Sequence, residues 1–226
     1  MTMYDNLLQL PLFQGLCKDD FTSIIERVKF HFLTLKDGET IARQGDACRR
    51  LVFLLNGSIS AYTTDDDHNF TLSETISAPY IIEPHSLFGG KTVYTATYKA
   101  KSETKLLCID KQYIYTQLNN YEIFRLNYLN ILSNKYQQAR VKLWQTRFGQ
   151  LEEKLATFLL NRCLQPYGEK TLQITMDDLG KLIGETRINV SKVLNEMQKK
   201  ELVQLKRKEI YIPEFGKLTD GLLEQI

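Results

Sequence analysis

Four polar or cationic side chains lie close together between residues 175 and 203: Arg187, Asn189, Ser191 and Lys192. In the major groove of DNA, Arg or Lys can bond the edge of guanine, and Asn can bond the edge of adenine. Such side chains act together only if one element presents them on a single exposed face. The residue types therefore indicate recognition of base edges, on the condition that this segment forms an exposed helix.

The hydrophobic spacing of this segment predicts two short helices joined by a tight turn. The first helix has an apolar stripe at helical spacing, formed by Leu179, Leu182 and Ile183. Gly184 can take positive φ at the turn, and Thr186 is the expected N-cap of the second helix. The inner face of that helix consists of four apolar residues: Val190, Val193, Leu194 and Met197. The pattern predicts a DNA-binding helix-turn-helix, although an ordinary helical hairpin has the same spacing.

Flanking segments extend the helix pair into a winged helix. An amphipathic helix is expected over 150–164 and a short strand over 172–174, and a hairpin follows with the basic tip Lys206-Arg207-Lys208. Cations of such a wing bond phosphates, which positions a protein on DNA without carrying sequence information. From residue 181 to residue 208 there are eight Lys or Arg against three Glu, an excess that suits a polyanion. The expected DNA contacts are Thr175, Thr186, Arg187, Ile188, Asn189, Ser191, Lys192, Lys206, Arg207 and Lys208.

The region from about Phe30 to Asp110 has the pattern of many short strands. β-type runs are expected at Thr40–Ala42, Arg50–Leu55, Ile59–Thr63, Phe70–Ile76 and Leu106–Ile109. Turn glycines separate successive runs, and Asp65-Asp66-Asp67 is the expected tip of an exposed hairpin. Short strands with frequent turns predict an antiparallel sandwich or barrel of jelly-roll size, preceded by an amphipathic helix over Lys18–Val28.

The stretch from Lys111 to Trp144 contains no Gly or Pro and predicts one helix, about 50 Å long. One apolar stripe steps by three and four residues, as in a coiled coil: Leu129, Leu132, Tyr136, Ala139 and Leu143. A second stripe beside it consists of Phe124, Tyr128 and Ile131. We expect one stripe to pack on the β domain and the other to form a homodimer, the alternative being burial of both within one chain. Residues 146–149 are the expected hinge.

The composition argues against several classes of protein. A net charge of +2 with 43% hydrophobic and 25% charged residues is ordinary for a globular domain. The N-terminus has no secretory signal, and no apolar run is long enough to span a membrane. The cysteines are scattered, without the spacing of a zinc site or an iron–sulfur cluster: Cys17, Cys48, Cys108 and Cys163. We therefore expect a cytoplasmic protein with free buried thiols, no metal and no membrane partner.

Taken together, these features resemble the bacterial transcription regulators of the cyclic-AMP receptor and fumarate–nitrate regulator (Crp/Fnr) superfamily, over nearly the whole chain. In the first half the resemblance rests on Leu35–Asp46, Leu51–Ile59 and the lead-in 11–16. In the second half it rests on segments 178–187 and 190–194. It implies an α+β protein with a cyclic-nucleotide-binding-like β jelly roll at 1–110. A long dimerisation helix with its hinge at 111–147 and a winged helix-turn-helix at 148–226 would follow.

The same resemblance implies a homodimeric regulator rather than an enzyme, with double-stranded DNA and RNA polymerase as partners. Arg187 matches the family's base-contacting arginine, and Lys192 stands where an arginine is common. Ile188 replaces an acidic residue; it cannot accept from cytosine, but it can touch a thymine methyl. A palindromic operator is expected, with half-sites about 34 Å apart and a sequence different from familiar family operators.

The resemblance also concerns a small-molecule site. Relatives that bind cyclic AMP have a phosphate-binding turn with Gly-Glu and, several residues later, Arg-Ser-Ala. Here Ile82 replaces the glycine and Tyr94 replaces the arginine, so a buried phosphate would lose its cationic partner. We therefore expect an effector other than cyclic AMP. The expected pocket residues are Phe53, Glu83, Tyr94, Thr95, Ala96 and Arg140. Arg140 could instead face solvent or lie in the dimer interface.

Two other classes of protein remain open at this point. A cupin-like metal-dependent β-barrel enzyme would need clustered ligands, whereas His31, His68 and His85 are far apart in the sequence. A cyclic-nucleotide module that does not bind DNA, such as a kinase regulatory subunit, would leave Arg187 and Lys192 without a role.

Overall fold

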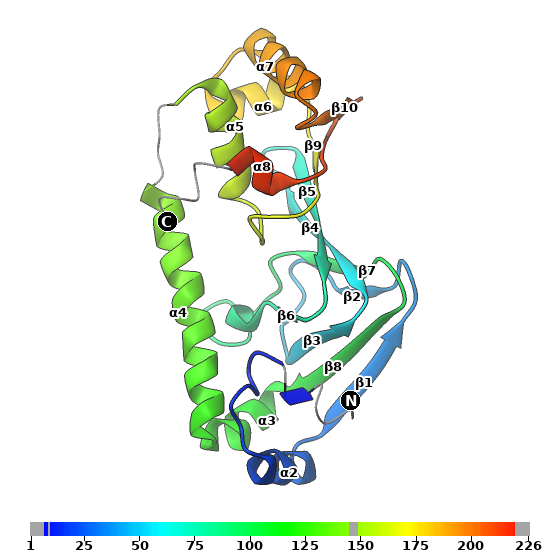
Figure 1. Cartoon of the computed structure of the whole chain (residues 1–226), viewed down its shortest axis with the longest axis vertical. Coiled ribbons are helices and arrows are strands. Elements are labelled where there is room, and N and C mark those ends of the chain that lie inside the picture. Colours follow the sequence, from blue (N-terminus) through cyan, green and yellow to red (C-terminus); the bar gives the residue numbers. More distant parts are fainter. Residues whose placement is uncertain (1–6, 9, 145–148, 220–226) are drawn as a thin grey trace. The chain divides into compact units, whose positions relative to one another are not determined.

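The computed structural model describes residues 7–8, 10–144 and 149–219 of the 226-residue chain (Figure 1). The chain divides into two compact units, one made of residues 1–60 and 76–137 and the other of residues 61–75 and 138–226. This division by packing groups residues 61–75 with the C-terminal part and places the other boundary between residues 137 and 138. Each unit is described by itself below.

The first unit contains a small helix, most of the strands and the greater part of a longer helix. Its elements are α2 (Lys18–Arg27), β1 (Phe30–Leu35), β2 (Thr40–Ala42), β3 (Arg50–Asn56), β6 (Tyr80–Ile82), η1 (Pro84–Ser86), β7 (Thr97–Ala100), β8 (Thr104–Asp110), α3 (Lys111–Thr116) and η2 (Leu118–Asn120). Strands β4 (Ser58–Asp65) and β5 (Phe70–Ser77) and helix α4 (Glu122–Trp144) begin or end in this unit and cross into the other. One sheet has the order β1-β8-β3-β6, with antiparallel pairing throughout.

Aromatic side chains fill the centre of this unit. Phe13, from the segment before α2, is completely buried and stacks on Phe53 of β3 with ring centroids 5.6 Å apart. It also contacts Phe21 of α2 and Phe124 of α4, with centroids 5.6 and 5.7 Å away. Buried rings of this size dominate the energetics of a core. Aromatic packing therefore contributes strongly to holding the helices on the sheet.

The predicted single helix over Lys111–Trp144 is wrong, because the chain forms α3, the 3-10 turn η2 and then α4. The side-chain amide of Asn120 donates to the carbonyl oxygen of Thr116 at 3.0 Å, and Tyr121 is extended at φ −92° and ψ 117°. Asn side chains compete with helical backbone bonds, so a helix can end without Gly or Pro. The 23 residues of α4 make a helix about 35 Å long rather than 50 Å.

Helix α4 has one packed and one exposed apolar stripe in the described part of its length. Phe124 is buried, and the Tyr128 hydroxyl donates to the carbonyl oxygen of Pro84 at 2.5 Å, which confirms packing on the β domain. On the other stripe Leu129 and Tyr136 are 57% and 64% exposed. Ala139 is also exposed and Leu132 is half-buried. The side chain of Leu143 and the expected hinge residues 146–148 lie outside the described residues.

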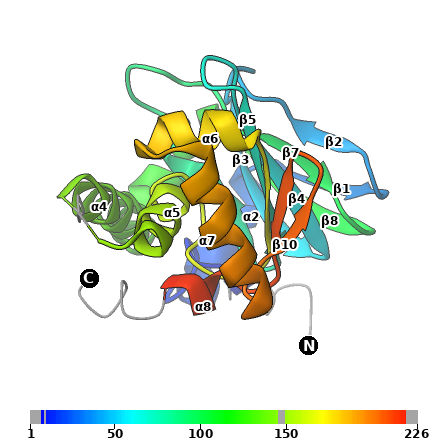
Figure 2. The same cartoon turned by 90° about the horizontal axis from the view of Figure 1, so that it is seen from above.

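The second unit is a winged helix joined by part of a hairpin from the β domain. Its elements are α5 (Leu151–Leu160), β9 (Lys170–Gln173), α6 (Met176–Ile183), α7 (Arg187–Lys199), β10 (Gln204–Lys206), β11 (Glu209–Ile212) and α8 (Phe215–Thr219). Helices α6 and α7 follow each other across a short turn and run in clearly different directions (Figure 2). Within this unit the strand order is β10-β11-β9-β5-β4, so the β4–β5 hairpin extends the sheet of the winged helix.

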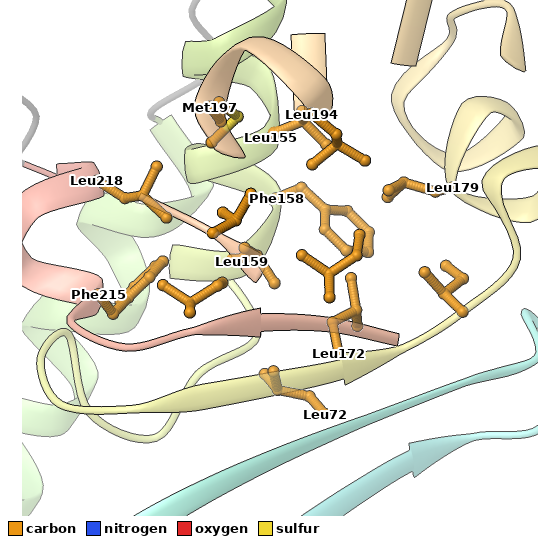
Figure 3. Close-up of a cluster of buried hydrophobic side chains, with 14 of the residues drawn as sticks. Leu72, Leu155, Phe158, Leu159, Leu172, Leu179, Leu194, Met197, Phe215 and Leu218 are labelled. Carbon is orange, nitrogen blue, oxygen red and sulfur yellow. The ribbon is translucent and has the colours of Figure 1, made fainter. Parts of the chain in front are cut away.

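The hydrophobic core of the second unit includes residues from that hairpin. Phe70 and Leu72 of β5 are 5% and 1% exposed and belong to the same cluster as Leu155, Leu179 and Leu194. Leu72 pairs in register with Leu172 of β9, and the two side chains lie near each other at the edge of the cluster (Figure 3). The winged helix is therefore completed by a strand that the sequence assigns to the β domain.

The structure confirms the predicted α+β fold of a β jelly roll, a helix with an exposed apolar stripe and a winged helix-turn-helix. All five strand runs named for the β domain occur, and β1, β6 and β7 are further strands in the same region. Three cysteines are buried as expected, but Cys17 is exposed and is the N-cap of α2. In the part of the chain that the structure describes, no helix is long and apolar enough to cross a membrane.

Candidate nucleic-acid interface and sensor site

Side-chain caps start both helices of the helix-turn-helix. The hydroxyl of Thr175 accepts from the Asp178 amide at 3.1 Å and donates to its carboxylate at 2.6 Å. This hydrogen bond holds the pKa of Asp178 below its usual value, helped by Lys181. The hydroxyl of Thr186 accepts from the Asn189 amide at 3.2 Å, as expected of the N-cap of α7. Each cap satisfies a backbone donor that the first helical turn cannot pair, and so fixes where the helix begins.

Two glycines shape the turn between the helices. Gly184 ends α6 in the left-handed region, at φ 70° and ψ 36°. Gly180 faces the turn so closely that a Cβ there would lie 2.7 Å from the backbone oxygen of Glu185. The Glu185 carboxylate is in turn bonded by Lys154 of α5 at 2.7 Å, which lowers its pKa. The position of α7 is therefore set by backbone proximity and by an ion pair to α5.

The outer face of α7 has the composition that base contact requires. Arg187, Asn189 and Lys192 are exposed, and Ile188 is 78% exposed, whereas Ser191 is half-buried. Arg187 lies 3.4 Å from the carboxylate of Asp177 on α6, a solvent-exposed pair that costs little to break. Three residues of the opposite face are buried as predicted, namely Val190, Leu194 and Met197, and Val193 is half-buried.

The wing presents its cations at a two-residue turn between β10 and β11. Arg207 and Lys208 are exposed at this turn, and Lys208 has φ 59°. Lys206 pairs with Glu209 at 3.1 Å. A cavity of about 620 Å³ lies at the base of the wing, and its lining includes Thr175, Arg207 and Lys208. The structure thus brings the expected contacts from α6 and the wing to one region of the second unit.

In the first unit, the carboxylate of Glu83 is buried in a ring of hydrogen-bond donors. Both of its oxygens lie 2.9 Å from the Thr95 amide, and the Ala96 amide lies 3.1 Å from Oε1. The hydroxyls of Ser86, Thr95 and Tyr98 donate to it at 2.6, 2.8 and 2.9 Å. Glu83 is 2% exposed. We call these five donor groups the Glu83 cradle.

Comparisons with known proteins identify the two domains that contain these sites. A family model described as a cyclic nucleotide-binding domain matches residues 32–121, and one described as a Crp-like helix-turn-helix domain matches residues 153–220. The chain belongs to the Crp/Fnr superfamily. It is therefore a Crp/Fnr-type transcription regulator with a sensor domain and a DNA-binding domain. The alternative of a cupin-like metal-dependent enzyme is not supported, because the relatives are transcription regulators.

Individual Crp/Fnr relatives cover most of the chain at low identity. The fumarate and nitrate reduction regulatory protein of Vibrio cholerae is 24% identical over 210 residues, which cover 89% of this chain and 81% of that protein. The cyclic AMP receptor protein of Thermus thermophilus is 24% identical over 200 residues, covering 86% and 88%. The crystal structure of the T. thermophilus catabolite activator protein shares the fold, with a TM-score of 0.54, 20% identity and coverage of 96% and 100%. Membership of the Crp/Fnr family supports DNA binding and dimerisation for this chain in general terms.

The structure separates the expected effector residues of this Crp/Fnr sensor domain into different environments. Glu83, Thr95 and Ala96 meet in the Glu83 cradle, whereas Phe53 is a fully buried part of the aromatic core. Arg140 is exposed on α4 and belongs by packing to the second unit.

Tyr94, which stands where cyclic-AMP-binding relatives have arginine, is buried beside Cys48. Burial raises the pKa of its phenol far above the usual value, and a hydrogen bond with the Cys48 thiol adds to the shift. Tyr94 also lines a second cavity of about 420 Å³ that sequence reasoning missed, together with Arg49, Arg50 and Asp110. Arg50 bonds Asp110 at 2.7 Å at this site. The adjacent Arg49-Arg50 pair was the available signal in the sequence.

Proposed function

We propose that this chain is a homodimeric regulator that recognises a palindromic operator with the outer face of α7 and grips phosphates with its wing. The exposure of Ile188 carries this proposal. An isoleucine 78% exposed at the start of a capped helix has no packing role there, and it lies between Arg187 and Asn189. An apolar group between two polar ones suits a thymine methyl between hydrogen-bonded base edges. Arg187 and Lys192 are the proposed base contacts, and Thr186 and Ser191 the proposed phosphate contacts.

The exposed stripe of α4 supports self-association as the means of pairing two recognition helices. Leu129 and Tyr136 expose apolar surface at coiled-coil spacing, and such a seam is normally covered by a second helix. A two-fold dimer would place its recognition helices on half-sites about one helical turn apart, roughly 34 Å. We further propose that the regulator contacts RNA polymerase. We also propose that it is located in the cytoplasm, because bacterial DNA lies in the cytoplasm.

The sensor domain in this proposal responds to a small molecule other than cyclic AMP. Tyr94 replaces the arginine that would pair with a cyclic phosphate, and its side chain is hydrogen-bonded with the Cys48 thiol. The two anion-facing amides of the family turn, those of Thr95 and Ala96, are bonded to Glu83. A buried phosphate would therefore lack its cation.

The proposal is tested by selecting preferred sites from random duplex DNA and measuring affinities by fluorescence anisotropy. Arg187→Ala should cost about 1–3 kcal/mol at the preferred site and relax sequence preference at one base pair. Ile188→Ala should relax the preference for thymine at the neighbouring base pair. Lys208→Ala should weaken binding to all sequences and reduce the salt slope by about 1. Lys199→Ala, which removes an exposed cation at the far end of α7, is the matched control and should change neither. Binding without any preference over bulk DNA would overturn the proposal.

A further inference from the structure

The Glu83 cradle has the chemistry of a dedicated anion site. A carboxylate only accepts hydrogen bonds, and all five groups around this one donate. All five are neutral, so none supplies a charge of its own. Two of them are successive backbone amides, Thr95 and Ala96, which point at the same oxygen, Oε1. Successive amides that converge on one point form the concave anion-binding arrangement known as a nest.

The backbone of Glu83 shows that the side chain is held in the cradle against a local cost. Glu83 has φ 38° and ψ 56°, in the left-handed region that a residue with a Cβ rarely adopts. Pro84 follows directly, and Ser86 donates back to the carboxylate from the turn η1. Such backbone conformations persist only where the surroundings impose them. Here the hydrogen bonds from the five donor groups of the cradle to the Glu83 carboxylate hold the backbone of Glu83 in this conformation.

We propose that this cradle is an anion-binding site that the chain fills with its own Glu83 carboxylate, and that its free ligands would be small carboxylates. The amides that the family resemblance assigns to a ligand phosphate are thereby occupied from within the chain. This rests on the proposed function to the extent that the sensor domain takes no cyclic AMP at this turn. It goes further, because it names the group that occupies the turn and the class of anion that can replace it.

Glu83→Gly tests the proposal by emptying the cradle. Glycine adopts the observed φ and ψ without strain, so this variant removes the anion and relieves the backbone together. The group removed is the side chain CH₂–CH₂–COO⁻, which corresponds in size and charge to propionate. We expect full-length Glu83→Gly to melt below the wild type and to regain stability on addition of sodium propionate. Acetate should act more weakly, and butyrate should be too long for the space.

The controls separate the cradle from a general salt effect. Propionamide has the shape of propionate without the charge and should not stabilise Glu83→Gly. Sodium chloride at the same ionic strength should not stabilise it either. Glu39→Ala removes an exposed carboxylate that also accepts from a backbone amide, that of Lys36 at 2.6 Å, and it should show no response to propionate. Binding to Glu83→Gly measured by isothermal titration calorimetry should be saturable, with no binding to the wild type.

Two further variants decide the matter if Glu83→Gly does not fold. Glu83→Gln keeps the volume but turns an amide NH₂ toward a cradle of donors, so it should melt below the wild type. Tyr98→Phe keeps the carboxylate and removes one donor, so its melting temperature should fall less than that of Glu83→Gln. An unchanged melting temperature in Glu83→Gln, or a Glu83→Gly protein that ignores propionate, would overturn the proposal. Cyclic AMP binding by the wild type would contradict the proposed function instead.

Discussion

Lys170→Met should sharply destabilise the DNA-binding unit, because it leaves a buried carboxylate without its cation. Lys170 on β9 and Glu74 on β5 form an ion pair at 3.1 Å, and each side chain is 1% exposed. The Lys170 ammonium also donates to the carbonyl oxygen of Tyr167 at 2.6 Å. The pair joins a strand of the winged helix to the β4–β5 hairpin and lies on paired positions of the ladder.

The magnitude follows from what the substitution removes and what it keeps. Methionine retains most of the lysine stem, so little packing is lost. Glu74 keeps the amide donors of Leu164 and Gln165, at 2.7 and 3.2 Å, but no longer has a counter-charge. Removing one partner of a buried pair typically costs about 3–5 kcal/mol. With a urea m-value of about 2 kcal/mol per M, the unfolding midpoint should fall by roughly 2 M.

Urea unfolding followed by far-UV circular dichroism measures the loss, and a second ion pair in the same unit is the control. Lys200, the C-cap residue of α7, pairs with Glu152 on α5 at 3.0 Å, with side chains 58% and 34% exposed. Lys200→Met should therefore cost less than about 1 kcal/mol. Glu74→Gln combined with Lys170→Met should recover part of the loss, because the glutamine oxygen can still accept from a backbone amide and no charge remains buried.

Equal, small losses in Lys170→Met and Lys200→Met would refute the reasoning. They would mean that water reaches the Lys170–Glu74 pair and that β5 is not held on β9 in solution. Amide hydrogen exchange provides an independent check. The amides of β5 that pair with β9 should be protected to the same degree as their partners, and Lys170→Met should lower both together.

Three further predictions concern other parts of the molecule. Gly180→Ala forces a Cβ to 2.7 Å from a backbone oxygen, so it should cost about 1–3 kcal/mol in urea unfolding and abolish DNA binding. Gly216→Ala is the control: its Cβ would lie 3.4 Å from a side-chain atom, so the same measurement should show little change. Leu129→Glu should give monomers in sedimentation velocity, whereas Asn134→Glu, on the outer side of the same helix, should remain dimeric. Burial raises the pKa of the Cys108 thiol from 9.0 to about 11, so Ellman's reagent at pH 8 should react with it only after unfolding. The stabilisation from keeping this thiol protonated is complete below pH 9 and is lost as the pH rises toward 11.

The elements whose signals are local could be predicted from the sequence. The caps Thr175 and Thr186, the turn residue Gly184 and the buried stripe of α7 all depend on neighbours within a few residues, and the structure has them where the pattern indicates. The break between α3 and α4 was missed because Asn120 has only a weak preference against helix. Its hydrogen bond to the preceding turn becomes visible only in three dimensions.

Features that depend on distant segments could not be obtained from periodicity. Thr95 and Ala96 donate to a carboxylate 12 and 13 residues earlier in the chain, and nothing in their own sequence indicates an anion between them. Glu74 and Lys170 are separated by 96 positions, and each would be predicted as an exposed charge if considered alone. Long-range polar pairs carry no hydrophobic period, so a pattern of apolar residues cannot reveal them.

The membership of residues 61–75 in the DNA-binding unit bears on how a Crp/Fnr sensor can act on DNA. The chain passes between the two units three times, within β4, within β5 and within α4. Two of these passages are the strands of one hairpin, and β5 is hydrogen-bonded along β9 of the winged helix. A paired strand transmits displacement far better than a flexible linker does, because its register with its neighbour is fixed. We therefore expect an effector that moves β4 or β5 to act on the winged helix through its sheet, while the exposed α4 stripe holds the proposed dimer together. If the β4–β5 hairpin has two positions, an effector changes their populations only to the extent that it binds one position more tightly than the other.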